Sequence, residues 1–104
     1  MEKYILAAIS RPLEGMSEEF NRCYDEQHLP DLCALPGVIS ARRYQASPAS
    51  LFPCPDEYLA LYEIETDDPA GLMQEMIRRS QSGEIRRMQT LDQASAKLWL
   101  FRQI

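Results

Sequence analysis

Three stretches of the chain carry apolar side chains on both faces of an extended strand. These are Lys3–Ser10, Glu57–Glu65 and Ala94–Gln103. In the last of them Leu98 and Trp99, two large apolar residues, alternate and must point in opposite directions. A strand that is apolar on both sides is typical of a sheet covered on both faces. The chain therefore has to place a layer of structure against each side of its sheet.

The order of the expected elements defines the fold class. We expect, in sequence, strand Lys3–Ser10, a helix from Ser17, a short helical turn Pro30–Leu35, strand Val38–Ala46, an irregular loop Ser47–Asp56, strand Glu57–Glu65, a helix opened by Asp67, Asp68 and Pro69, a short helical piece through Ile85, Met88 and Leu91, and strand Ala94–Gln103. This β-α-β-β-α-β order predicts a ferredoxin-like α+β fold: one four-stranded antiparallel sheet with two helices on one face. With 104 residues, we expect a single domain over 1–104.

Two helices cover only one face of such a sheet. Trp99 and Phe101 would face the other side, and soluble monomers rarely expose a large apolar patch. We therefore predict a homodimer that pairs through the sheet face, with Trp99 buried at or near the interface.

Composition excludes some partners. The formal net charge is −5, with 16 acidic and 11 basic side chains, which argues against nucleic acid because phosphate binding needs a basic face. The apolar stretch Tyr4–Ile9 is too short to span a membrane, and no cleavage site follows it, so we expect no signal peptide. Cys23, Cys33 and Cys54 form an odd set without metal-ligand spacing, which favours a reducing cytoplasm.

The first helix carries the chemistry-bearing residues. Phe20, Tyr24 and His28 recur every four residues and share a face, and Pro30 cannot continue a regular helix interior. His28, the only histidine, is the side chain whose unperturbed pKa allows it both to take and to give a proton near neutrality. From its position alone, a pocket role and a structural role at the helix end are equally supported.

The stretch Phe20–Asp31 (FNRCYDEQHLPD), followed by Leu35–Val38 (LPGV), resembles the signature of EthD-like proteins, which belong to the dimeric α/β-barrel superfamily. The resemblance implies ferredoxin-like subunits whose sheets pack into a barrel, with a pocket between each sheet and its own helices. Relatives include cofactor-free monooxygenases, polyketide cyclases, muconolactone-type isomerases and proteins of aromatic-compound degradation. The histidine that corresponds to His28 lines the pocket in several of them.

We therefore take His28, Tyr24 and Asp31 as candidate catalytic residues. The Tyr24 hydroxyl could donate a hydrogen bond to a substrate, although its ring is expected to pack on the sheet. Asp31 could orient the imidazole, as carboxylates beside catalytic histidines do, or could cap the turn after Pro30.

Aromatic side chains supply a candidate pocket for a flat apolar ligand: Phe20, Tyr44 and Tyr62. Either Arg42 or Arg43 must face the same side, because neighbours on a strand alternate. Cys54 has no neighbouring base and is a poor nucleophile, and a single histidine among scattered carboxylates does not indicate a metal site.

Besides a purely structural dimer in which His28 fixes a helix kink, two functions remain open. The first is an enzyme without a cofactor that acts on a small cyclic or aromatic intermediate by isomerisation, cyclisation, decarboxylation or oxygenation, with His28 transferring a proton. The second is a non-catalytic binding or accessory protein of a degradation or biosynthetic pathway, which uses the same pocket.

Overall fold

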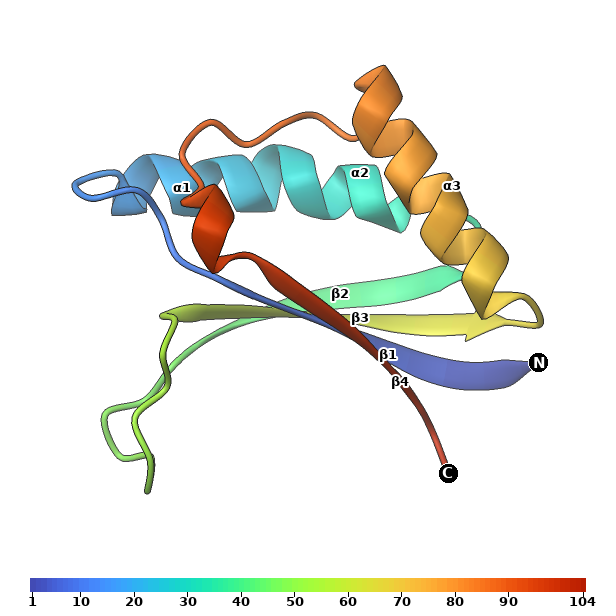
Figure 1. The fold of residues 1–104 in the computed structure, drawn as a ribbon, viewed down its shortest axis with the longest axis horizontal. Coiled ribbons are helices and arrows are strands. Elements are labelled where there is room, and N and C mark those ends of the chain that lie inside the picture. Colours follow the sequence, from blue (N-terminus) through green and yellow to red (C-terminus); the bar gives the residue numbers. More distant parts are fainter.

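Four strands form one antiparallel sheet in the order β2-β3-β1-β4, seen in a computed structural model that describes all 104 residues (Figure 1). The strands are β1 (Glu2–Ser10), β2 (Val38–Gln45), β3 (Tyr58–Thr66) and β4 (Lys97–Arg102). Both helical layers lie on the same side of the sheet. The predicted ferredoxin-like α+β fold is confirmed.

The first helical layer is continuous through Pro30. It consists of α1 (Ser17–Cys23), the π-helix η1 (Tyr24–His28) and α2 (Leu29–Cys33). In the wider π turn the Leu29 N–H donates to the Tyr24 carbonyl, five residues back. This widening directly precedes Pro30, which has no N–H and whose ring would clash with the carbonyl four residues back in a regular α-helix. The expected break at Pro30 is thus replaced by a change of helical pitch.

The second helix, α3 (Pro69–Ser82), begins as the sequence predicts. The Asp68 side chain accepts a hydrogen bond from the Gly71 N–H at 3.0 Å, and Pro69 occupies the first turn. Gly83, at φ +86°, adopts the left-handed conformation that ends many helices.

The prediction of a short helical piece through Ile85, Met88 and Leu91 is wrong. Residues 83–92, here called the 83–92 segment, run back along the helical layer as an irregular chain (Figure 1). Ile85 and Met88 are buried in the core, and Leu91 forms an isolated bridge with Pro12. Burial of apolar residues three apart in an extended segment produced the same spacing as a helix.

Strand β4 also begins later than expected. Gln93–Ser95 form the short 3₁₀ turn η2, capped by the Asp92 side chain, which accepts from the Ala94 N–H. The strand itself starts at Lys97.

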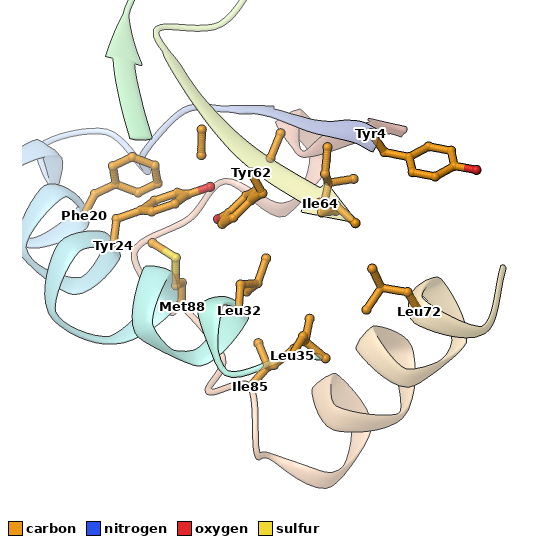
Figure 2. Close-up of a cluster of buried hydrophobic side chains, with 13 residues drawn as sticks. Tyr4, Phe20, Tyr24, Leu32, Leu35, Tyr62, Ile64, Leu72, Ile85 and Met88 are labelled. Atoms are coloured by element: carbon orange, nitrogen blue, oxygen red, sulfur yellow. The ribbon is translucent and has the colours of Figure 1, made fainter. Parts of the chain in front are cut away.

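The core lies between the sheet and the helices. Figure 2 shows Phe20 and Tyr24 from the first helical layer beside Tyr62 and Ile64 of β3. Phe20 and Tyr62 are fully buried. Strand alternation places their sheet neighbours on the opposite surface, which has no covering layer within this chain.

We call that surface the open face. On the register of the strands, its residues include Ile5, Ala7 and Ile9 of β1, Ser40, Arg42 and Tyr44 of β2, Leu59, Leu61 and Glu63 of β3, and Lys97, Trp99 and Phe101 of β4. Trp99 is 48% exposed and Phe101 57% exposed in the single chain. The expected burial of Trp99 in a dimer stays a prediction.

Candidate functional site

A cavity of about 350 Å³ lies between the sheet and the helical layer, beside the β1–β4 edge. Strands β1 and β4 contribute Ala8 and Leu98, and η1 contributes Tyr24 and His28. The 83–92 segment supplies the largest share of the remaining wall, which also includes Ser80 at the end of α3. Its volume is at the lower end of the range for small-molecule sites, about 300–1,000 Å³.

The π-helix brings the two predicted residues to this cavity together. Tyr24 and His28 bound η1, and their rings meet edge to face with centroids 4.9 Å apart. Tyr24 in turn meets Phe20 edge to face at 5.4 Å. The face shared by Phe20, Tyr24 and His28 is therefore the one turned toward the sheet, as the spacing predicts.

His28 is held in an unusual electrostatic environment. The pKa of its imidazole is lowered to about 4, mainly by burial; the nearby Asp31 carboxylate opposes this shift and Arg43 adds to it. Its Nδ1 atom is buried and has no hydrogen-bond partner in the protein. Buried polar atoms without a partner are rare, and this nitrogen is shielded from solvent as well as unbonded, so a ligand in the cavity reaches the ring by its other edge. At neutral pH the ring is uncharged and can accept a proton.

This environment makes folding stability depend on pH. The unfolded chain carries His28 with a pKa near 6.5 and the folded chain with a pKa of about 4, so the unfolded state binds more protons between these values. The free energy of unfolding should therefore fall as pH drops from about 6.5 toward 4, by up to about 3 kcal/mol. Urea titrations of the protein and of His28→Gln at several pH values measure this loss.

His28 is the only histidine, so the difference between the two proteins isolates its contribution. Carboxylates such as Asp31 titrate in both and cancel. Parallel stability curves for the protein and the variant between pH 6.5 and 4.5 would contradict the burial of the imidazole.

Tyr24 and Tyr62 direct their hydroxyl ends toward one another (Figure 2). Burial raises the pKa of both phenols, so both are neutral at physiological pH. Tyr24 lines the cavity, whereas Tyr62 is fully buried behind it. Of the two, Tyr24 is the one that can present its hydroxyl to a ligand.

Asp31 does not bind His28. Its carboxylate accepts hydrogen bonds from the Arg86 backbone N–H at 2.9 Å, from Nε at 3.0 Å and from Nη2 at 2.9 Å. These bonds to Arg86 lower the pKa of Asp31. The contact ties α2 to the 83–92 segment, so Asp31 fixes the cavity wall and acts on His28 only through its charge.

The predicted aromatic pocket divides between the two sides of the sheet. Phe20 and Tyr62 are fully buried core residues next to Tyr24, and neither lines the cavity. Tyr44 lies on the open face, 47% exposed, opposite Leu59. It is therefore not a neighbour of His28, because successive residues of β2 alternate and Arg43 takes the inward position.

Arg43 is the arginine that points inward, and its guanidinium already contacts other groups of the protein. The group stacks 4.5 Å from the Tyr24 ring centroid and donates to Asn21 Oδ1 at 2.7 Å and to Asp25 Oδ1 at 3.1 Å. Arg42 points to the open face and pairs with Glu63. Arg43 thus orders the first helical layer on the sheet and is not a member of the cavity lining.

Sequence reasoning missed the wall formed by the 83–92 segment and the start of β4. Arg86, Arg87, Met88 and Lys97 line the cavity with His28. The Arg86–Arg87 pair reads as solvated surface charge, and only the apolar Ile85 and Met88 around it signalled that this stretch packs inward.

Other chemistry is not assembled in this chain. No group of three or more His, Cys, Asp or Glu side chains could hold a metal ion. The three cysteines are free, and the Cys54 thiol donates to the Asp56 carbonyl at 3.0 Å. No helix is long and apolar enough to cross a membrane.

The fold of this chain is shared with several solved structures. No protein-family model matches the sequence, and no curated protein matches it. Among solved structures, it is similar to an EthD family protein from Bacillus halodurans, with 13% identity, full coverage of both chains and a TM-score of 0.66. A dimeric ferredoxin-like protein from Thermobifida fusca matches at 12% identity over 98% of this chain and 92% of its own, with a TM-score of 0.60.

The heme degrader MhuD from Mycobacterium tuberculosis also matches, at 12% identity over 97% of this chain and 95% of its own, with a TM-score of 0.66. At these identities the likeness shows the fold. The resemblance of the Phe20–Asp31 stretch to EthD-like proteins is confirmed at that level: this chain has the ferredoxin-like fold of EthD-like proteins.

Proposed function

We propose that the protein is a cofactor-independent enzyme that moves a proton on a small cyclic or aromatic intermediate, with His28 as the proton-transfer group. The observation that carries this proposal is an uncharged imidazole on the wall of a largely apolar cavity. Such a group accepts a proton from an acidic C–H or O–H and returns it elsewhere on the same molecule. Tyr24, one helical turn away, is placed to donate a hydrogen bond to the substrate oxygen.

The experiment is deuterium exchange. Small cyclic ketones and phenols are incubated with the protein in D₂O, and loss of the acidic C–H signal is followed by NMR. The proposal expects exchange well above the buffer rate for at least one class of ligand. Binding without any exchange would favour the second function below.

The second candidate function is a non-catalytic binding or accessory protein of a degradation or biosynthetic pathway. One observation favours it. A pKa of about 4 makes His28 a weak base, and proton transfer is most effective when the pKa lies near the working pH. The same cavity would then hold the ligand without changing it.

We also propose that two copies pair through the open face and that the protein works in the cytoplasm. Trp99, Phe101 and Tyr44 are each about half exposed on one surface, which is unusual for a monomer. A structural neighbour is described as a dimeric ferredoxin-like protein. The three free cysteines suit a reducing compartment.

A further inference from the structure

The charged residues of the cavity wall are basic, whereas the chain as a whole is acidic. Its lining contains Arg86, Arg87 and Lys97 and no aspartate or glutamate, although acidic residues outnumber basic ones 16 to 11 in the chain. His28 adds no charge at neutral pH. The wall is therefore basic in a protein of net charge −5.

The three cations differ in what already neutralises them. Arg86 is paired with Asp31, whose carboxylate accepts two bonds from its guanidinium. Lys97 lies 4.0 Å from the buried Asp56, which also lies 3.9 Å from Arg11. Arg87 forms no ion pair and no side-chain hydrogen bond with the protein.

Only two of the eleven basic side chains lack an ion pair. Nine lie within salt-bridge distance of a carboxylate: Lys3, Arg11, Arg42, Arg43, Arg78, Arg79, Arg86, Lys97 and Arg102. The two that remain are both exposed: Arg22 of α1, and Arg87 at the rim of the cavity. An unpaired guanidinium beside an apolar cavity is well suited to bind a planar anion with two parallel hydrogen bonds.

We propose that the cavity takes a one-ring ligand that carries a carboxylate, with the ring against Met88 and Leu91 and the carboxylate on Arg87. The inference rests on the proposed function and names its substrate class. Lys97 pairs in register with Ile9 of the open face and its ammonium lies near Asp56, so Arg87 is the one cation assigned to the ligand. The modest cavity volume, about 350 Å³, limits the apolar body of the ligand to a small ring system.

An anionic ligand also bears on His28. A negative charge brought into the cavity favours the protonated imidazole and raises its pKa toward neutrality. A carboxylate substrate would thus correct the weakness of His28 as a base in the empty protein. Arg87 would then hold the ligand, and His28 would transfer its proton.

Matched pairs of acids and amides test the charge requirement. Benzoate with benzamide, and 4-hydroxybenzoate with 4-hydroxybenzamide, have nearly the same shape and differ in charge. Affinities are measured by ligand-observed NMR for the protein, for Arg87→Gln, and for Arg22→Gln as the matched control. We expect each acid to bind about tenfold more tightly than its amide, a preference lost in Arg87→Gln and kept in Arg22→Gln.

The outcomes separate the two proposals. Equal binding of acid and amide overturns the carboxylate assignment and leaves the proton-transfer function standing. An acid preference that survives in Arg87→Gln overturns the role of Arg87. An Arg87-dependent preference without deuterium exchange in any ligand supports the site and overturns the enzyme. No binding in either series overturns both.

Discussion

Replacing His28 with glutamine is expected to lower the rate of substrate deuterium exchange by about 10²–10⁴-fold, the usual contribution of a catalytic acid or base. Glutamine keeps a polar group near the cavity and cannot carry a proton between two positions. Ligand affinity should change little, because the apolar wall and Arg87 remain. Exchange rates by NMR and affinities by titration give the two quantities independently.

The pH profile of this reaction distinguishes a catalytic role of His28 from a purely structural one. The pH dependence of kcat/KM reports the free enzyme, so its acid limb should lie near the lowered pKa of about 4 and not near 6.5. An exchange rate in His28→Gln within a few fold of that of the unmodified protein would remove His28 from the reaction.

Replacing Trp99 with aspartate is expected to convert a dimer into a monomer. Trp99 sits beside Ala7 on the open face, and Ala7 also pairs with Leu61. A charge at this position on the edge strand β4 would be buried without a partner in a sheet-to-sheet interface, so the dissociation constant should rise by about 10²–10³-fold or more. Sedimentation at micromolar concentration should change from twice the 12.0 kDa chain mass to the chain mass.

Phe52→Asp is the matched control. Phe52 is an aromatic residue that is 81% exposed in the loop between β2 and β3, outside the open face. It should leave the dimer intact. A protein that sediments as a monomer before any substitution, or a Trp99→Asp variant that remains dimeric, would refute pairing through this surface.

The fold was largely predictable because each element carries local signals. Asp68 and Pro69 mark the start of α3, and alternation along β1 and β3 separates the buried from the exposed side. His28 and Tyr24 were found at the cavity because their spacing places them on one helix face. These are properties of neighbouring residues, and a sequence records them directly.

The rest of the site depends on contacts that no local pattern records. Arg86 meets Asp31 across 55 positions, and this contact brings Arg87 to the cavity wall. The side of the sheet that receives Tyr44 depends on the register of β2, since a shift by one residue reverses every side chain. The irregular path of the 83–92 segment is set by Pro12, Asp31 and the core, not by its own sequence.

The π-helix constrains the number of residues in this helix more strongly than it constrains which residues they are. Deleting one residue between Tyr24 and His28 would convert the π turn into a regular α turn, in which Leu29 still bonds to the Tyr24 carbonyl, now four residues back. Leu32 and Leu35, both 3% exposed, would keep their side of the helix, but the ring of Pro30 would meet the carbonyl four residues back. Glu26, which is exposed on η1, can be exchanged freely. Evolution of this chain can therefore substitute residues on the outer surface of the helix but cannot gain or lose one there.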